Sequence, residues 1–93
     1  MNTTARNNPD ESRYELEGDG RIVSIAEYRM VDDVVVFTHT ETAEDLREQG
    51  FAERLIEFAL DDVRLAGRTV VPRCAFVRDY IRAHPQYGDL LAA

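Results

Sequence analysis

The order and spacing of the apolar residues predict an α+β fold, in which helices pack on one mixed sheet. Residues 12–17 alternate between polar and apolar side chains, which is typical of a half-buried strand. Residues 51–66 place their apolar side chains at helical spacing. A short apolar run, residues 69–71, follows that helix. A strand–helix–strand order requires a right-handed crossover, so this last strand is expected to be parallel to the one before the helix.

The strands before the helix are expected to form an antiparallel meander. The Gly-Asp-Gly sequence at residues 18–20 is typical of a tight turn, so residues 21–28 are predicted to return beside the first strand. A second turn at residues 30–33 leads into residues 34–37, which are all apolar. Because this run does not alternate, it predicts a central strand that is covered on both faces.

The second half of the chain predicts two helices. Residues 38–46 are polar and are expected to connect the sheet to the first helix, which Gly67 ends because glycine favours the position after a helix. Residues 76–83 carry apolar side chains at helical spacing and stop before Pro85, which predicts a second helix. Residues 87–91 are expected to form a final turn.

The chain is expected to be one small domain with a flexible start. Residues 1–11 are polar and lack the apolar core of a signal peptide, so we predict a flexible tail before a single domain over residues 12–93. Nothing approaches the ~18 continuous apolar residues of a membrane span. We therefore expect a cytoplasmic protein without a membrane partner, either a monomer or a weak homodimer.

Composition excludes several classes of function. The net charge of −7 argues against nucleic-acid binding. The single cysteine excludes an internal disulfide and a multi-cysteine metal site, and no other residues have metal-ligand spacing. The chain lacks lysine, so it has no Gly-x-x-x-x-Gly-Lys loop for nucleoside triphosphate hydrolysis.

A glycine-centred turn, Arg-Glu-Gln-Gly-Phe-Ala at residues 47–52, lies directly before the first predicted helix. A glycine turn that opens a helix leaves several backbone N–H groups without partners and points them at one place. Such a place suits an anion, and a pyrophosphate in particular. Gly50 is expected to matter because a Cβ there would keep the backbone from approaching a phosphate closely. The turn therefore predicts a nucleotide-type cofactor.

The Arg-x-x-Gly-x-Ala pattern of residues 47–52 resembles the pyrophosphate loop of the GNAT superfamily of acyl-CoA N-acyltransferases. Residues 72–77 and 84–90 are similar to the end of a very small GNAT-like family, sometimes called the "CG" acetyltransferases after its Cys and Gly. His-Thr-Glu at residues 39–41 also fits this pattern. The resemblance covers about residues 14–90.

This resemblance implies a minimal GNAT-like fold and an acetyl-CoA-dependent N-acetyltransferase. Acetyl-CoA would lie in a cleft where the strands at residues 34–37 and 69–71 splay apart, with its pyrophosphate on the loop amides. The acceptor is expected to be a primary amine on an exposed protein lysine or a polyamine. An acyl-CoA-binding module with little turnover is one alternative, and a protein that keeps the fold without the ligand is another. The implied cofactor contacts are Phe37, Thr38, His39, Arg47, Gln49, Gly50, Phe51, Ala52, Cys74 and Tyr80.

Acetylation of an amine needs a base for the amine, donors for the developing oxyanion and an acid for the leaving thiolate. Tyr80 is the candidate acid, since many GNAT enzymes place a tyrosine at about this position; a core aromatic is the alternative. Cys74 is expected to line the thioester pocket, to accept the acetyl group itself, or to pack as an inert residue. Glu41 and His39 are candidate bases, unless they are only solvated or structural. Tyr87 either closes over the cofactor or anchors the C-terminus.

Overall fold

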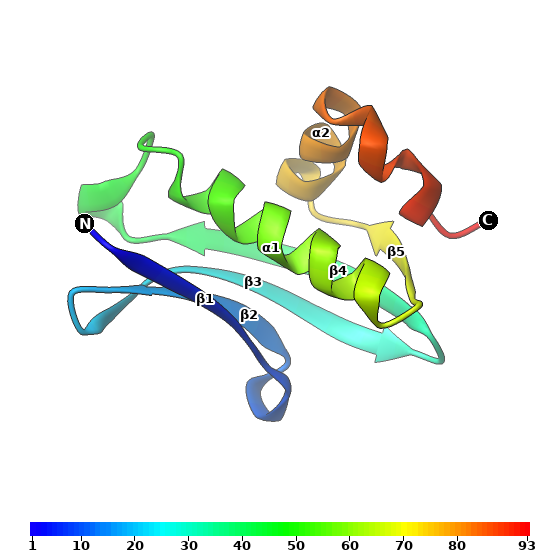
Figure 1. Cartoon of the computed structure of the whole chain (residues 1–93), viewed down its shortest axis with the longest axis horizontal. Helices are drawn as coiled ribbons and strands as arrows, with labels where there is room; N and C mark the ends of the chain where they lie inside the picture. Colours follow the sequence, from blue (N-terminus) through cyan, green and yellow to red (C-terminus); the bar gives the residue numbers. More distant parts are fainter.

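The computed structural model describes all 93 residues and contains one five-stranded sheet with helices on a single face (Figure 1). The strands are β1 (Thr3–Asn8), β2 (Arg13–Gly18), β3 (Arg21–Val31), β4 (Val34–Thr42) and β5 (Thr69–Pro72). The α-helices are α1 (Phe51–Leu65) and α2 (Ala75–Ala83), and short 3-10 helices span Pro9–Glu11, Glu44–Leu46 and Pro85–Leu90. None of the helices combines the length and the apolar character that crossing a membrane requires.

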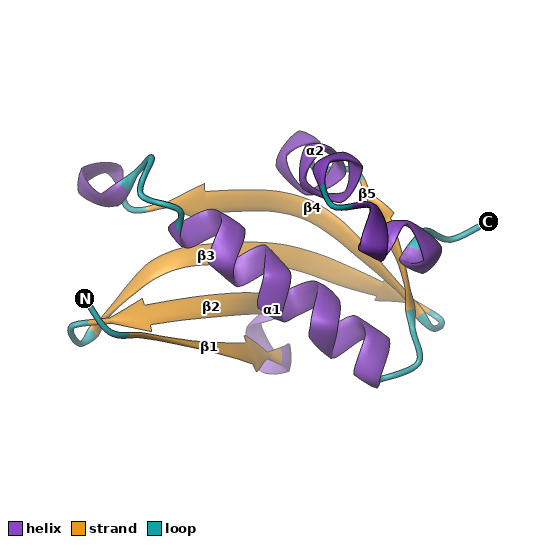
Figure 2. Cartoon of the chain, turned by 45° about the horizontal axis from the view of Figure 1, so that its top comes forward, coloured by secondary structure: helices purple, strands orange, loops and turns teal.

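The strands lie side by side in chain order, β1-β2-β3-β4-β5. The first four pair antiparallel, whereas β5 pairs parallel to β4. In Figure 2, α1, which links β4 to β5 along the chain, crosses the sheet diagonally over β2 and β3, and α2 packs beside β4 and β5. The predicted α+β fold, with an antiparallel meander and a parallel crossover strand, is confirmed.

The core lies between α1 and the sheet. The apolar stripe of α1 consists of Phe51, Leu55, Ile56, Ala59, Leu60 and Val63, all of them buried. Opposite this stripe, the ring of Tyr14 lies 5.4 Å from that of Tyr28 and 6.1 Å from that of Phe37 between centroids. The Tyr14 hydroxyl donates a hydrogen bond of 2.7 Å to Asp62 of α1. Burial, with this bond and the charge of Asp62, raises the pKa of Tyr14, so the hydroxyl stays protonated and ties the helix to β2.

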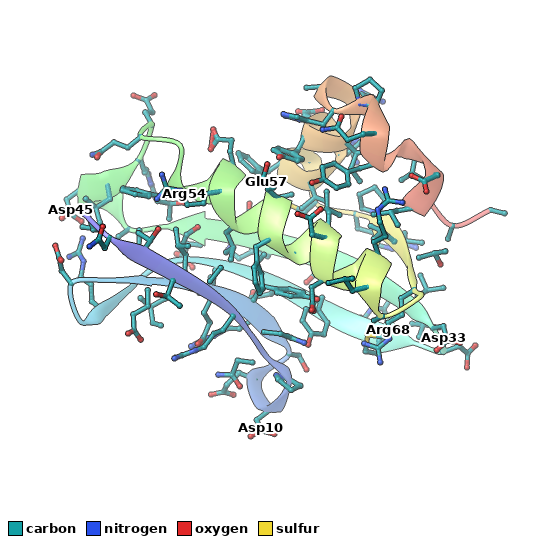
Figure 3. All side chains as sticks on the ribbon, in the orientation of Figure 1. Asp10, Asp33, Asp45, Arg54, Glu57 and Arg68 are labelled. Atoms are coloured by element: carbon teal, nitrogen blue, oxygen red, sulfur yellow. The ribbon has the colours of Figure 1, made fainter.

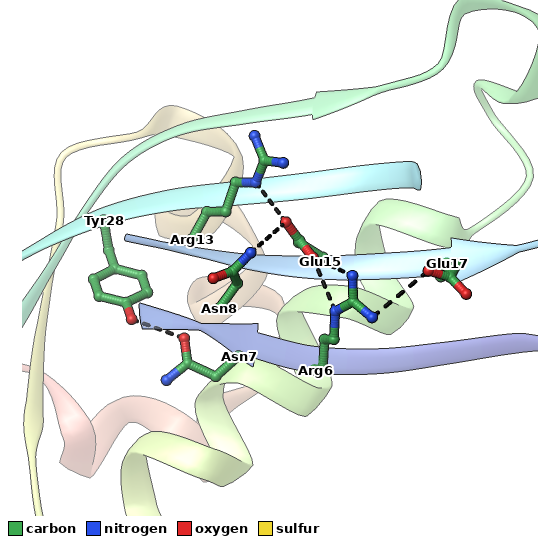
Figure 4. A network of polar contacts seen from close by, with 7 residues as sticks. All are labelled: Arg6, Asn7, Asn8, Arg13, Glu15, Glu17 and Tyr28. Carbon is green, nitrogen blue, oxygen red and sulfur yellow. Dashed lines mark hydrogen bonds and ion pairs between the residues drawn. The ribbon is translucent and has the colours of Figure 1, made fainter. Parts of the chain in front are cut away.

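The face of the sheet opposite α1 carries a buried carboxylate, that of Glu15, which is only 1% exposed. Arg6 Nε donates to Glu15 Oε1 at 2.9 Å, and Arg13 Nε donates to Oε2 at 2.7 Å. Asn8 Nδ2 adds a bond of 3.1 Å to Oε2 (Figure 4). Burial alone would raise the pKa of Glu15, but the hydrogen bonds from these three side chains outweigh it, and the pKa is lowered.

The prediction of a flexible tail over residues 1–11 is wrong for most of that segment. Thr3–Asn8 form β1, which pairs antiparallel with β2 from Thr3↔Gly18 to Asn8↔Arg13. Side chains fix the strand as well, because Tyr28 donates to Asn7 Oδ1 at 2.7 Å (Figure 4). The polar composition was misleading because this edge strand is held by ladder bonds and charged partners rather than by apolar burial.

The strand β4 is longer than expected, since residues 38–42, predicted as a connection, continue it to Thr42. A register shift opposite Glu27 and Tyr28 leaves Thr38 without a partner on β3, which marks a bulge in β4. Residues 34–37 were expected to be covered on both faces. Val35 and Phe37 are buried in the core under α1, and Val36, on the face without a helix, is also only 5% exposed.

The C-terminus is anchored to the core. Tyr87 is buried, and its hydroxyl donates to Asp61 of α1 at 2.8 Å. After the last 3-10 helix, Leu91 forms a parallel bridge with Val70, and the backbone N–H of Ala92 donates to the Val70 carbonyl at 2.9 Å. Of the two roles considered for Tyr87, closing over the cofactor or anchoring the C-terminus, these contacts support the anchoring role.

Candidate functional site

The turn before α1 leaves its backbone donors free. Gly50 precedes the helix with φ at +82°, in the left-handed region that favours glycine. The first hydrogen bond of the helix runs from the N–H of Arg54 to the Gly50 carbonyl at 3.1 Å. No protein oxygen accepts a bond from the backbone N–H groups of residues 48–53. These groups, at the positive end of the α1 dipole, can bind an anion.

A groove of about 440 Å³ opens at this helix end. We call it the loop groove; it is lined by His39, Thr40, Glu41, Thr42, Leu46, Arg47, Glu48, Gly50, Phe51, Ala52, Glu53 and Phe76. A Cβ built on Gly50 would meet no protein atom within 4 Å. The backbone at Gly50 is therefore open to a ligand.

Five of the ten predicted cofactor contacts line this groove: His39, Arg47, Gly50, Phe51 and Ala52. The other five, Phe37, Thr38, Gln49, Cys74 and Tyr80, are not among its lining residues.

The parallel strands β4 and β5 separate beside this groove. Their pairing ends at Phe37↔Pro72, after which β4 continues to Thr42 with a partner only on its β3 side. At the branch point the carbonyl oxygen of Phe37 accepts bonds from the N–H groups of Arg73 (3.0 Å) and Cys74 (3.1 Å). Phe37 thus closes the branch point, with its side chain fully buried in the core.

Cys74 lies just beyond this branch point, at the start of α2. Its Sγ is 3.6 Å from Thr40 Oγ1, and Thr40 lines the loop groove. The thiol is therefore next to the part of β4 that has no β5 partner.

Tyr80 has a hydroxyl that makes no hydrogen bond to the protein, although only 8% of the residue is exposed. Its ring stacks on His84 at 3.9 Å between centroids, and His84 Nδ1 is bonded to the Tyr80 carbonyl at 2.8 Å. Burial raises the pKa of Tyr80, and the nearby carboxylates Glu57, Asp61 and Glu53 raise it further. Tyr80 is thus a neutral hydroxyl with a proton to donate, one helical turn beyond Phe76.

The two candidate bases form a pair at the strand end. His39 Nε2 lies 3.7 Å from Glu41 Oε2, and each side chain is more than half exposed. The two residues are two positions apart on β4, so they project from the same face of the strand. Their cross-strand partners on β3 are Glu27 and Ile25. This face is the one opposite α1, because Ile25 also pairs with Glu15.

Sequence reasoning missed several lining residues of the loop groove, among them Leu46, Glu48, Glu53 and Phe76. Phe76 was considered only as part of the apolar side of the second helix, and Glu48 only as part of the glycine turn. It also missed Arg54, whose guanidinium lies 5.6 Å from the Phe51 ring centroid and donates to Thr3 Oγ1 at 2.7 Å. Figure 3 shows Arg54 near the beginning of α1, on the side of β1.

The composition of the groove decides which ligands it suits. No group of three or more His, Cys, Asp and Glu side chains is arranged to hold a metal ion. Arg47 favours an anion near the free amides, whereas Glu48 and Glu53 oppose it.

A family model described as GCN5-related N-acetyl-transferase matches residues 13–90. No curated protein matches the chain.

Two solved structures share the fold. The NMR structure of a GCN5-like protein from Staphylococcus aureus superposes with a TM-score of 0.73 at 17% identity, over 97% of this chain and 88% of the other. The ribosomal-protein-S18-alanine N-acetyltransferase of Escherichia coli gives a TM-score of 0.65 at 17% identity, over 76% of this chain and 49% of the enzyme. At these identities the two likenesses support the fold, and the family model supports the family. The chain belongs to the GCN5-related N-acetyltransferases.

Proposed function

We propose that the protein transfers an acetyl group from acetyl-CoA to a primary amine. The observation that carries this proposal is the row of free backbone N–H groups at residues 48–53, which opens on a groove beside the point where β4 and β5 separate. A diphosphate linkage needs several donors at one place, and an acyl-pantetheine arm needs an unpaired strand edge. The two features lie next to each other on this chain.

The residues of the chain fit such a ligand. The amides that follow Gly50 bind the diphosphate at the positive end of α1, and Gly50 leaves them exposed. Beyond Phe37, β4 has no strand partner on its β5 side, so its backbone groups there are available to the pantetheine amides. Cys74 and Thr40 border the same opening, where they would line the thioester pocket.

Bound acetyl-CoA supplies an acyl group that is already activated as a thioester. The Glu41–His39 pair accepts the proton of the acceptor amine, directly or through water, because it lies at the free end of β4. Tyr80 donates a proton to the leaving thiolate from its unpartnered hydroxyl.

An acyl-CoA-binding module with little turnover is the second candidate. The exposure of His39 and Glu41 favours it, because solvated side chains orient an amine less well than buried ones. A thiol-release assay with amine acceptors separates the two candidates.

Calorimetric titration with acetyl-CoA tests the phosphate site. Gly50→Glu places a carboxylate beside the free amides, so binding should weaken by at least tenfold. Gly67→Glu is the matched control, since Gly67 also has positive φ and open space around its Cβ position, but lies beyond the other end of α1. Each variant carries backbone strain of about 1–2 kcal/mol. Equal acetyl-CoA affinity in the two variants would contradict the assignment of the phosphates.

A further inference from the structure

A second groove of about 420 Å³ adjoins the first one. We call it the sheet groove; it is lined by Arg13, Ile22, Val23, Ser24, Ile25, Glu41, Thr42, Ala43, Glu44 and Arg47. It shares Glu41, Thr42 and Arg47 with the loop groove, so the two cavities meet at the end of β4.

The sheet groove borders the face of the sheet that carries no helix. Tyr14 and Leu16 of β2 pack into the core under α1. Side chains alternate between the two faces along a strand, so Arg13 and Glu15 of β2 point to the opposite face. Ile25 pairs with Glu15 on one side and with Glu41 on the other, which places both Ile25 and Glu41 on that face. The two grooves thus approach the end of β4 from different directions.

One wall of the sheet groove is formed by Ala43 and Glu44, and specific hydrogen bonds hold this segment in place. The backbone N–H of Ala43 donates to the Val23 carbonyl at 2.8 Å. Arg21 Nη2 bonds both carboxylate oxygens of Asp45 at 2.8 Å, which ties the 3-10 helix at Glu44–Leu46 to the start of β3. Figure 3 shows Asp45 at the end of the molecule where β1 and the β2–β3 turn also lie. The wall is therefore part of the folded domain before any ligand arrives.

The chemistry of the sheet groove combines an apolar floor with free carboxylates. Ile22 and Ile25 supply apolar surface. Arg13 is paired with Glu15, whereas no hydrogen bond engages the Glu44 carboxylate, and Glu41 makes only the loose contact with His39. An aliphatic stem that ends in one cation suits this arrangement, since such stems cover apolar surface while the charged head stays with polar groups.

We propose that the sheet groove binds the acceptor, and that the acceptor is the side chain of a lysine in a peptide. This inference rests on the proposed acetyl transfer. The lysine stem lies on Ile22 and Ile25, and its nitrogen reaches Glu41, where the two grooves meet. A polyamine is disfavoured because its repeated charges would also meet Arg13 and Arg47.

The transfer balances in atoms and charge. The lysine ammonium first gives up a proton to the Glu41–His39 pair, and the neutral nitrogen then bonds to the acetyl carbonyl carbon. The carbon–sulfur bond of acetyl-CoA breaks, the thiolate takes a proton from Tyr80, and the second proton that the nitrogen loses returns to the Tyr80 oxygen through water. The products are an acetyl-lysine amide, CoA and one proton, which the Glu41–His39 pair releases to solvent.

Binding and kinetics with one variant pair test the acceptor site. Glu44 lines the sheet groove only, so Glu44→Arg should weaken binding of a fluorescent lysine peptide with blocked termini by about fivefold, without any acetyl-CoA present. The KM for that peptide should rise by the same factor, while kcat and the Kd of acetyl-CoA stay unchanged. Glu11→Arg is the control, because Glu11 is exposed and lies outside both grooves.

The outcomes separate this inference from the proposed function. If acetyl-CoA does not bind wild-type protein, the proposed function fails. If acetyl-CoA binds but Glu44→Arg and Glu11→Arg show equal peptide affinity, only the acceptor site is overturned. A norleucine peptide that binds as well as the lysine peptide, or a free polyamine acetylated with a lower KM, would also overturn it. Ile22→Thr provides a second variant, because it reduces the apolar surface of the sheet groove without changing the charge of the residues that line it.

Discussion

Replacing Glu15 with glutamine removes the carboxylate on which Arg6, Asn8 and Arg13 converge. The amide keeps one acceptor oxygen, but its NH₂ group must face guanidinium donors. Hydrogen bonds to a charged group contribute about 1.5–3 kcal/mol, so the loss should be about 2 kcal/mol in the free energy of unfolding. For a domain of this size, that lowers Tm by about 10 °C.

Urea and thermal unfolding followed by circular dichroism measure this loss. Glu17→Gln is the matched control, since Glu17 lies on the same face of the sheet but is 44% exposed and 3.6 Å from Arg6. A surface pair of this kind contributes about 0–1 kcal/mol. Equal loss of stability in the two variants would refute the reasoning that the buried network holds β1 on the sheet.

The pH dependence of the Glu15 contribution has a definite sign. The folded pKa of Glu15 lies below its ordinary value of about 4.5. The unfolded chain therefore binds the proton first as the pH falls, and the stabilisation is complete only above that ordinary value. It is lost as the pH falls further, through the folded pKa. The stability difference between wild type and Glu15→Gln should accordingly be full at pH 7 and shrink in acid. A difference that is constant with pH would contradict a charge-based role.

The remaining predictions concern the candidate chemistry. Tyr80→Phe keeps the stack on His84 but removes the hydroxyl, so kcat should fall by about 10²-fold while the Kd of acetyl-CoA is unchanged; an unaltered kcat would exclude Tyr80 as the acid. Cys74→Ala should retain most of the turnover, because the thiol lines the opening next to Thr40; loss of all activity together with an acetylated Cys74 in wild-type protein by mass spectrometry would instead show covalent transfer.

The parts of the fold that could be predicted from the sequence are those that local spacing determines. The apolar stripe of α1 and the apolar run at residues 34–37 depend only on their own residues, and the structure has both. The glycine turn was placed correctly because a left-handed backbone before a helix favours glycine. Each of these features is complete within a few residues.

The parts that could not be predicted depend on partners far along the chain. β1 has little apolar character of its own and is held by Glu15, Tyr28 and the β2 ladder. One feature of the sequence indicates the extension of β4 to Thr42: residues 38, 40 and 42 are threonines, and β-branched residues favour strands. The wall of the sheet groove depends on bonds between distant residues, among them Arg21–Asp45 and Ala43–Val23, and no local pattern predicts these pairs.

The way in which the C-terminus ends on the sheet matters for anyone who joins this fold to another protein. The border strand β5 is covered there by Leu91 and by the amide of Ala92 bonded to Val70. A fusion made directly after Ala92 would strain the hydrogen bond from Ala92 to Val70, which covers the edge of β5. An uncovered edge strand is prone to pair with another chain. A flexible Gly/Ser spacer after Ala93 would leave this closure intact.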